Sequence, residues 1–380
     1  MSKKKKIIFY TGSRADYGLL EPIIKKIYNK SELHLIIGPH HLKDNFGKTL
    51  NKIQKNFFKK VYFCKTKINY ENVDITEFIS SSSKNYKNLL RKIRPSMAVV
   101  LGDRYEVLSF TIASFFERIN ICHLHGGEKT IGSFDDTIRH VITKFSAFHF
   151  SSNNLYKKRI ISLGENKNNI FNLGSIGAEV VKKLNYLNKK EIFNLLKINT
   201  KKEIALLTFH PETNSVITYK TQIKTFLLSL KKFKNIHFIF TASNPDPSGQ
   251  MFNREIKKFV KKNLNSSFYY SLGNKNYLNL AKFVKLIIGN SSSAIIEAPS
   301  LGVPILNIGD RQKGRIMSKN VFSVPLQKNI IEKAITKILK EKNKIYSKFN
   351  PYYKKNSIVN ISKKILNLVK EKNTYKYFYD

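Results

Sequence analysis

Short apolar runs alternate with longer segments of helical periodicity along the whole chain of 380 residues. Continuous apolar runs of about four to eight residues are typical of strands buried on both faces, and their alternation with helical patterns predicts βαβ units. In the first half the expected strands cover residues 6–10, 33–37, 97–101, 119–124, 147–151 and 169–174. In the second half they cover residues 203–209, 236–241, 267–271, 284–289 and 303–308. We therefore expect an α/β protein with two doubly wound, Rossmann-like halves.

Two glycines, Gly174 and Gly177, mark a change of region after the first set of strands. We predict an N-terminal domain of residues 1–178 and a C-terminal domain of residues 179–380, because a chain of this length suits two domains. A Lys-rich segment at 357–372 predicts a final helix that can pack back on the first domain. Facing loops of two such halves predict an interdomain cleft suited to a small anionic ligand.

The formal net charge is +42, from 68 Lys and Arg residues against 26 Asp and Glu residues. The lysines are scattered and interleaved with asparagine, as in residues 188–203, which is typical of solvated faces rather than of a basic stripe. No zinc-finger spacing, RNA-binding aromatic motif or basic region with heptads occurs. We expect polyanion binding at low salt and no specific nucleic-acid partner.

The apolar runs are too short for membrane insertion or export. None approaches the roughly 20 residues that cross a bilayer, and residues 7–10 fall short of the roughly 7 to 15 residues of a signal-peptide core. Cys64 and Cys122 are too few for a disulfide framework or a thiolate metal site. We expect a soluble, cytoplasmic protein with no membrane partner.

Loops rich in polar residues follow several of the predicted strands. The loops in question are "TGSRADYG" (11–18), "LGDRYE" (101–106), "HLHGGE" (123–128), "TFHPET" (208–213) and "GNSSSAIIEAPSLG" (289–302). Parallel sheets bind ligands beyond the carboxyl ends of their strands, where the connections diverge. We therefore expect these loops at the binding edges of the two halves.

The last of these loops predicts a phosphate site. Ser291, Ser292 and Ser293 lie between an apolar strand and a helix, so hydroxyls, backbone N–H groups and the positive helix end converge there. Glu297, about one turn into that helix, could accept hydrogen bonds from two ribose hydroxyls. The alternative is an ordinary serine N-cap. Neither a P-loop motif nor a G-x-G-x-x-G turn occurs, which argues against a P-loop nucleotidase and a dehydrogenase.

Cations are available near the same predicted edges. Arginine suits bidentate phosphate contacts, and the arginines beside predicted strand ends are Arg14, Arg104, Arg311 and Arg315. His210 precedes Pro211, which discourages a helix there and leaves the ring in a loop. A structural and a functional role for this histidine are equally compatible with the sequence.

The first half supplies acids and bases, namely Asp103, His125, Glu128, Asp135, Asp136, Arg139 and His140. Carboxylates crowded together keep ordinary pKa values only when cations intervene, and such groups make good proton carriers. Two glycines, Gly126 and Gly127, are expected to let the backbone approach a ligand.

The segment "FDDTIRHVITK" (134–144) allows two interpretations. Taken alone it can be a capped helix whose aspartates satisfy free N–H groups and whose Ile138, Val141 and Ile142 form a buried stripe. That interpretation leaves Arg139, His140 and Lys144 unexplained. The polar loops around the segment favour a catalytic site.

Together these motifs resemble the UDP-N-acetylglucosamine 2-epimerases, specifically their hydrolysing branch. The resemblance spans both halves, through residues 11–18, 102–106, 123–128, 135–144, 209–213 and 289–315. It implies two Rossmann-like domains in the GT-B arrangement with a UDP-sugar in the cleft. It also implies conversion of UDP-N-acetylglucosamine and water to UDP and N-acetylmannosamine for sialic-acid synthesis. We expect no metal and no cofactor, and a homo-oligomer, either a dimer or a tetramer.

The resemblance also implies residue roles. UDP would be held by Arg14, Ala15, Asp16, Arg104, Leu272, Ser291, Ser292, Ser293, Glu297 and Arg311. The reacting sugar would be lined by Asp103, His125, Glu128, Asp135, Asp136, Arg139 and His210, with His41 nearby. Several family members carry glutamate at the position of His125, so that carboxylate's role falls either to His125 or to Glu128.

Three other functions fit the sequence. A GT-B glycosyltransferase would need an acceptor for UDP release. A non-enzymatic basic protein would bind RNA with an affinity that collapses with salt. The third is the hydrolysing 2-epimerisation of UDP-2,4-diacetamido-2,4,6-trideoxyglucose, in legionaminic-acid synthesis. It fits the sequence because no motif recognises the C4 substituent of the sugar.

Overall fold

The computed structural model describes residues 4–42, 49–66, 74–244, 248–341, 346–371 and 376–380. The chain forms two compact units. Unit 1 consists of Met1–Glu128, Asp135–Glu179 and Tyr352–Asp380, and unit 2 consists of Lys129–Phe134 and Val180–Pro351. The segment Lys129–Phe134 thus belongs to the second unit, and the C-terminal residues belong to the first.

Unit 1 is built from a parallel sheet and flanking helices. Its strands are β1 (Lys6–Thr11), β2 (Glu32–Ile37), β3 (Lys60–Phe63), β4 (Met97–Leu101), β5 (Asn120–Leu124), β6 (Phe148–Ser151) and β7 (Ile170–Asn172). Its helices are α1 (Arg14–Ile27), α2 (Ile75–Ile93), α3 (Tyr105–Phe116), α4 (Asp135–Phe145), α5 (Asn154–Ser162) and α13 (Ser357–Leu368). Short 3-10 turns are η1 (Pro39–His41), η3 (Thr49–Lys52), η4 (Lys55–Phe57) and η5 (Lys167–Asn169). Helix α6 (Ile176–Lys183) begins in unit 1 and ends in unit 2.

Unit 2 repeats the pattern with different lengths. Its strands are β8 (Glu203–Thr208), β9 (Ile236–Thr241), β10 (Ser266–Tyr269), β11 (Leu286–Gly289), β12 (Ile305–Ile308) and β13 (Val321–Val324). Its helices are α7 (Lys189–Leu195), α8 (Tyr219–Leu230), α9 (Gly249–Lys262), α10 (Asn274–Ala281), α11 (Ser292–Ile296), α12 (Lys328–Lys340) and the 3-10 turn η6 (Ala298–Leu301).

Helix α2 shows how the local sequence sets an element. Asp74 caps its start by accepting a hydrogen bond from the Glu77 N–H at 2.9 Å. Phe78, Tyr86 and Leu90 are buried on one face, as the helical period requires. The helix ends at Arg94, which takes the left-handed conformation that often closes a helix.

Both sheets are parallel throughout and have equivalent strand orders. The order is β3-β2-β1-β4-β5-β6-β7 in unit 1 and β10-β9-β8-β11-β12-β13 in unit 2. In each unit the chain starts at a central strand, runs outward, and returns to the other side of that strand. The predicted doubly wound α/β fold is therefore confirmed, and the switch points lie between β1 and β4 and between β8 and β11.

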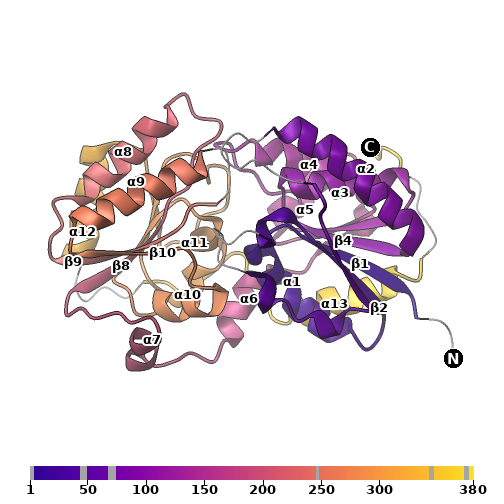
Figure 1. Cartoon of the computed structure of the whole chain (residues 1–380), viewed down its shortest axis with the longest axis horizontal. Coiled ribbons are helices and arrows are strands. Elements are labelled where there is room, and N and C mark those ends of the chain that lie inside the picture. Colours follow the sequence, from indigo (N-terminus) through magenta and orange to yellow (C-terminus); the bar gives the residue numbers. More distant parts are fainter. Residues whose placement is uncertain (1–3, 43–48, 67–73, 245–247, 342–345, 372–375) are drawn as a thin grey trace. The chain divides into compact units, whose positions relative to one another are not determined.

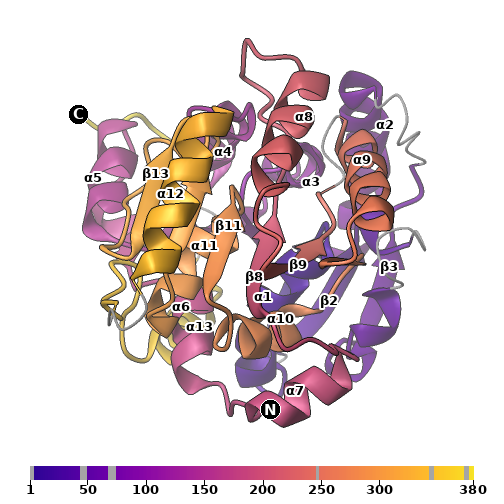
Figure 2. The ribbon, with the colours of Figure 1, turned by 90° about the vertical axis from the view of Figure 1, so that its left-hand side faces the viewer.

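Helices cover both faces of each sheet. In unit 1, α2, α3 and α4 pack side by side, and α13 lies against α1 (Figure 1). In unit 2, α8, α9 and α12 pack on one face of the sheet, where their apolar side chains form one core (Figure 2). Residues of α7, α10 and α11 build the second core of this unit, on the opposite face. Both faces of the central strands are thus buried under helices, which accounts for the continuous apolar runs of these strands.

All eleven predicted strands are present, and none of their ends moves by more than two residues. The prediction missed β3 and β13. Both are edge strands of four residues without a fully buried one, so their apolar patterns are short and weak compared with those of the central strands.

Candidate functional site

Arg139 on α4 organises the acids of unit 1. Its side chain is buried, with 1% of its area exposed, and its guanidinium bonds Asp103, Asp136 and one main-chain carbonyl. Nε donates to Asp103 Oδ2 at 3.0 Å, and Nη2 lies against the same oxygen. Nη1 donates to Asp136 Oδ1 at 3.0 Å and to the carbonyl oxygen of Glu128 at 2.9 Å. One buried cation therefore brings together loops after β4 and β5 and the first turn of α4.

The guanidinium of Arg139 keeps its positive charge although it is buried. Burial alone would lower the pKa of Arg139, but Asp103 and Glu128 outweigh burial and hold this pKa above its ordinary value. The carboxylates of Asp103 and Asp136 stay partly open, with 22% and 23% of their side-chain area exposed. Two oriented, accessible carboxylates beside a permanent cation can bind sugar hydroxyls and move protons.

Helix α4 does not follow the simple capped-helix interpretation. It begins at Asp135, but Val141, expected in the buried stripe, is 37% exposed. The buried residues of α4 are Arg139, Ile142 and Thr143. The face turned inward is thus partly polar because Arg139 occupies it.

His125 and Glu128 lie in the loop after β5. His125 has a φ of 66°, a left-handed conformation that costs energy for a residue with a Cβ, and such strain is concentrated at functional sites. Its Nδ1 lies 3.7 Å from Glu128 Oε1. The Glu128 carboxylate is more deeply buried than the ring and accepts a hydrogen bond from Ser152 Oγ at 3.3 Å.

The two glycines that follow His125 serve packing. A Cβ at Gly127 would lie 2.5 Å from the Tyr156 carbonyl oxygen, and one at Gly126 would lie 3.0 Å from His123 Nδ1. Gly127 also has a φ of 77°. Protein atoms thus fill the space on which a side chain at either position would intrude, and the approach of a ligand to this backbone stays a prediction.

A second ionic group of unit 1 centres on Glu106, whose side chain is fully buried. Its carboxylate accepts two hydrogen bonds from Arg104, from Nε and Nη2, each at 3.1 Å, and also bonds His40 Nε2. Burial opposes the charge of Glu106, but Arg104 and His40 outweigh it and hold the pKa of this carboxyl below its ordinary value. Sequence reasoning did not single out Glu106 or His40.

The segments after β1 and β2 supply the remaining predicted residues of unit 1. Asp16 Oδ2 accepts a hydrogen bond from the Ser13 N–H at 2.8 Å, and burial raises the pKa of Asp16 to about 6 against the opposing effect of Arg104. Ala15 is exposed on α1, which starts at Arg14. His41 is buried, with Nε2 at 3.0 Å from Thr11 Oγ1.

In unit 2, Asn290 joins the loops at the switch point. Its side chain pairs with the main chain of His210 in both directions: Oδ1 accepts from the His210 N–H at 2.7 Å, and Nδ2 donates to the His210 carbonyl at 2.9 Å. The Asn290 carbonyl accepts from Arg311 Nη1 at 3.3 Å and from Gln312 Nε2 at 2.8 Å. The predicted residues His210 and Arg311 are thus parts of one network.

Glu212 fixes the turn that carries Arg311. Its Oε1 accepts a hydrogen bond from the Asp310 N–H at 3.0 Å. Burial raises the pKa of Glu212, and the N–H groups of Arg311 and Asp310 oppose that rise. Gly309, at φ 80°, is required here, because a Cβ would lie 1.9 Å from Glu212 Oε1. The Lys129–Phe134 segment lies against the same turn, where the Gly132 N–H donates to the Asp310 carbonyl at 3.2 Å.

The serine loop has the predicted form with one difference. Ser291 is the N-cap of α11, and Ser292 and Ser293 are its first residues. Glu297 lies just after this five-residue helix, not within it, because the chain tightens into η6. Its Oε2 accepts from Ser293 Oγ at 3.1 Å and from Asn274 Nδ2 at 3.4 Å. Leu272, expected among the residues that hold UDP, has its side chain in the core.

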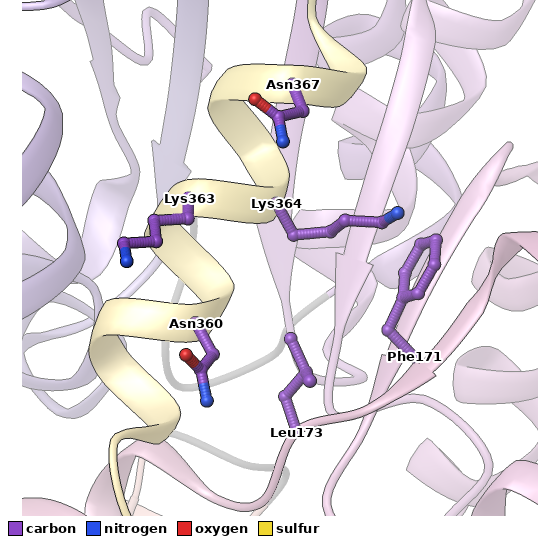
Figure 3. Close-up of a pocket in the computed structure, with 6 residues that line it drawn as sticks. All are labelled: Phe171, Leu173, Asn360, Lys363, Lys364 and Asn367. Carbon is purple, nitrogen blue, oxygen red and sulfur yellow. The ribbon is translucent and has the colours of Figure 1, made fainter.

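A separate shallow pocket of about 260 Å³ lies on unit 1. Its walls come from α13, from β7 and from the residue after β7. Lys364 points over the ring of Phe171, with Nζ 4.1 Å from the ring centroid (Figure 3). None of its lining residues is a predicted site residue. Among the residues that the structure describes, no helix could span a bilayer and no three His, Cys, Asp or Glu side chains are placed to hold a metal ion.

Four of the residues missed by sequence reasoning share one property. Glu106, Glu212, Asn290 and Gln312 lie within quoted motifs, next to residues that were chosen. Each is buried and makes its hydrogen bonds to a predicted site residue or its turn. Buried polar groups need hydrogen-bond partners. A polar residue next to a chosen site residue, in a motif that follows a buried strand, was therefore the signal that could have identified them.

Two parallel, doubly wound sheets with charged loops at their switch points place this protein in the Rossmann-like α/β class. The model of one family, UDP-N-acetylglucosamine 2-epimerase, matches residues 25–366. The chain belongs to this family and is an enzyme of it.

Individual relatives agree with this membership. The chain is 38% identical over 383 residues to polysialic acid biosynthesis protein P7 of Escherichia coli, covering 99% of this chain and 97% of the relative. It is 37% identical over 340 residues to the GDP/UDP-N,N'-diacetylbacillosamine 2-epimerase (hydrolyzing) of Campylobacter jejuni, covering 88% of each. The fold is similar to that of UDP-GlcNAc 2-epimerase from Neisseria meningitidis bound to UDP-GlcNAc, with a TM-score of 0.76, 17% identity, and 95% and 100% of the two chains covered.

Proposed function

We propose that this protein is a hydrolysing UDP-N-acetylglucosamine 2-epimerase that converts UDP-N-acetylglucosamine and water to UDP and N-acetylmannosamine. The observation that carries the proposal is the buried Arg139 with the partly exposed carboxylates of Asp103 and Asp136. Such a group suits proton transfer at a sugar carbon. Family membership and the name of the Escherichia coli relative, which refers to polysialic acid biosynthesis, support the same activity.

In the proposed reaction a base of unit 1 removes the proton at C2 while the C1–O bond breaks. The electron pair of that bond leaves with UDP, and C1 and C2 form the double bond of a glycal. Water then adds at C1 and a proton returns to C2 on the opposite face. Asp103, Asp135, Asp136 and Arg139 serve the sugar in this scheme, and Ser291–Ser293, Glu297 and Arg311 hold the nucleotide.

We assign the role of the family's glutamate to His125. The His125 side chain has 10% of its area exposed, against 2% for Glu128. Its backbone at the end of β5 is in the strained left-handed conformation. Glu128, 3.7 Å behind Nδ1, is suited to orient the ring and to stabilise its protonated form. His125→Gln is therefore expected to abolish turnover, and Glu128→Gln to lower it less.

A second substrate is favoured by one specific observation. The Campylobacter jejuni relative is named for the hydrolysis of a diacetylated bacillosamine nucleotide, at almost the same identity as the Escherichia coli relative. The same catalytic groups would serve UDP-2,4-diacetamido-2,4,6-trideoxyglucose, because the reaction at C1 and C2 does not involve C4 or C6.

The test is to incubate the purified full chain separately with each UDP-sugar and to identify products by NMR. Release of N-acetylmannosamine from UDP-N-acetylglucosamine supports the proposal, and exclusive turnover of the diacetamido sugar selects the second substrate. UDP release that requires an added acceptor would instead identify a glycosyltransferase. Asp103→Asn serves as the inactive control.

A further inference from the structure

A buried carboxylate connects the end of α4 to other parts of unit 1. Glu165, in the loop after α5, has 2% of its side-chain area exposed. Its Oε1 lies 2.8 Å from Lys144 Nζ at the end of α4, and its Oε2 lies 3.0 Å from His149 Nε2 on β6 and bonds Lys376 Nζ. We call these four residues the Glu165 cluster.

The charges of the Glu165 cluster are unequal. Burial opposes the charge of Glu165, but His149, Lys144 and Lys376 outweigh burial and hold the pKa of this carboxyl below its ordinary value. Burial lowers the pKa of His149, so its ring is neutral near pH 7 and donates to the carboxylate from Nε2. One carboxylate thus faces two lysine ammonium groups, whose other N–H groups need other acceptors.

Those acceptors are the carbonyl groups at the ends of two helices. Lys376 Nζ donates to the carbonyl of Ser146, the residue after α4, at 2.6 Å. Lys144 Nζ donates to the carbonyl of Leu163, the C-cap of α5, at 2.9 Å. A cation at the C-terminal end of a helix is stabilised by the unpaired carbonyls and by the helix dipole. Lys144, which the sequence left unexplained, therefore caps α5, and Lys376 caps α4.

The segment that carries Lys376 fits closely against the loop after α5. The N–H of Tyr379 donates to the carbonyl of Gly164 at 3.1 Å. Gly164, at φ 72°, leaves room for the ring of Phe378, on which a Cβ would intrude. The ammonium of Lys144 lies 5.2 Å from the centroid of the same ring. The segment is thus held by a charge, by a ring and by a main-chain hydrogen bond.

Helix α4 has little apolar packing of its own. Its buried residues are Arg139, Ile142 and Thr143, and only Ile142 among them is apolar. Apolar burial is also non-directional, so it does not by itself fix the rotation of a helix or its position along its axis. Directional polar contacts can fix both. Arg139 makes such contacts in the first half of α4, and the Glu165 cluster makes them at its end.

We propose that Lys376 is a positioning residue, which fixes α4 in the orientation that presents Asp136 and Arg139 to the sugar. This inference rests on the proposed function for the role of α4. A helix of this length moves as one body, so a shift at its last turn also moves its first turn. A displacement of about 1 Å in a catalytic group can cost about 100-fold in rate.

The first test separates catalysis from nucleotide binding. Lys376→Met removes the charge but keeps an unbranched side chain, and should lower kcat by about tenfold or more while UDP affinity, measured by calorimetry, stays within about twofold. Lys376→Arg keeps the charge at the end of α4 and should retain most of the rate. Lys370→Met, at an exposed position of the same unit, is the matched control and should change neither quantity. Wild-type kcat in Lys376→Met overturns the inference.

A double variant distinguishes positioning from a general loss of stability. If Lys376 acts through Asp136, the two substitutions are coupled and their effects do not multiply. Lys376→Met combined with Asp136→Asn should therefore lose less rate than the product of the two separate losses. Full multiplication would show that Lys376 acts independently of Asp136, which overturns the inference.

Hydrogen exchange of the full chain tests the position of α4 without any substrate. The amides of α4 should exchange about tenfold faster in Lys376→Met than in the wild type, while those of α8 in unit 2 remain unchanged. Equal exchange of the α4 amides in both proteins overturns the inference. If the wild-type protein acts on no UDP-sugar, the proposed function fails, while the exchange rates still decide whether Lys376 fixes α4.

Discussion

Glu297 illustrates how burial changes the chemistry of a single carboxyl group. Burial raises the pKa of Glu297 to about 7, although hydrogen bonds from Ser293 and Asn274 oppose the rise. In the ligand-free protein this group is therefore partly protonated near neutral pH. Ribose hydroxyls would act as donors to it and would favour the ionised form.

We predict that UDP binding tightens as pH rises from about 6 to 8, because only the carboxylate of Glu297 can accept from both ribose hydroxyls. Glu297→Gln should weaken UDP binding by about 1 to 3 kcal/mol at pH 8 and by less at pH 6. Calorimetric titrations of both proteins across this range measure the difference, which cancels the titration of UDP itself. A pH-independent difference would exclude Glu297 as the titrating contact.

Single residues such as Arg139 and Asn290 show how one buried polar group can organise a site. Each bonds groups from separate loops, and in each case the partners include residues with proposed functions. Removal of such a residue is expected to disturb several contacts together, so its effect will not be additive with those of its partners.

At the scale of elements, the first turn of α4 has two possible roles in the site. Its first turn holds Asp135 and Asp136, which could serve as helix caps or as catalytic groups. The structure directs Asp136 toward Arg139 by a 3.0 Å hydrogen bond, which a simple cap would not require.

Reaction in deuterium oxide distinguishes the two roles. The proposed elimination exchanges the C2 proton with solvent, so the released sugar should carry deuterium at C2. Asp136→Asn should lower turnover by about 100-fold or more with an unchanged melting midpoint. A cap would instead contribute about 1 kcal/mol of stability and leave exchange intact. Mass spectrometry and NMR of the sugar give the result, and undeuterated product from active wild-type enzyme would refute the elimination route.

Helix α13 depends on a residue far away in the sequence. Its N-cap, Asn356, makes no side-chain capping bond, and the fully buried Glu179 instead accepts from the Ile358 N–H at 2.6 Å. A carboxylate at a helix start is stabilised by the N–H groups and the helix dipole. Glu179 thereby holds the C-terminal helix to unit 1.

We predict that Glu179→Ala lowers the free energy of unfolding of unit 1 by about 1.5 to 3 kcal/mol, the order of a buried hydrogen bond to a charged group. Glu179→Gln keeps an accepting oxygen and should cost less. Hydrogen exchange of the α13 amides, together with urea unfolding, measures both variants. Equal stability of the Ala variant and the wild type would show that water replaces this cap.

At the scale of the whole molecule, buried ionisable groups make stability depend on pH in both directions. Burial lowers the pKa of His123 to about 3, so the unfolded chain binds protons that the folded chain does not. The carboxyl groups of Glu297 and Asp16 act in the opposite sense, because burial raises their pKa values to about 7 and about 6. Their contribution is present at low pH and is lost as pH rises through those values.

We predict that unit 1 loses stability as pH falls from about 6.5 toward 3, the window between the unfolded and folded pKa values of His123. His123→Gln can present an N–H near the position of Nε2, which bonds the Gly102 carbonyl at 2.8 Å, and should flatten this dependence. Urea unfolding followed by circular dichroism at several pH values measures the slopes. Parallel slopes for the two proteins would show that His123 does not cause the acid loss.

Local sequence patterns predicted much of the fold. The periodicity of apolar residues identified every central strand because those strands are buried on both faces. It missed β3 and β13, whose residues remain partly exposed at the sheet edges. The loops at the carboxyl ends of strands could be located as well, because a parallel sheet fixes the edge on which they lie.

The sequence by itself determined the fold class, the loops that carry chemistry and the family to which the chain belongs, because burial periodicity and motifs are written along the chain. Only the tertiary structure decided which polar groups are partners. Glu106 bonds His40 across 66 positions and Asn290 bonds His210 across 80, distances over which no local pattern operates. The pKa values of Arg139 and Glu297 depend on burial and on such partners, which exist only once the helices and strands have packed.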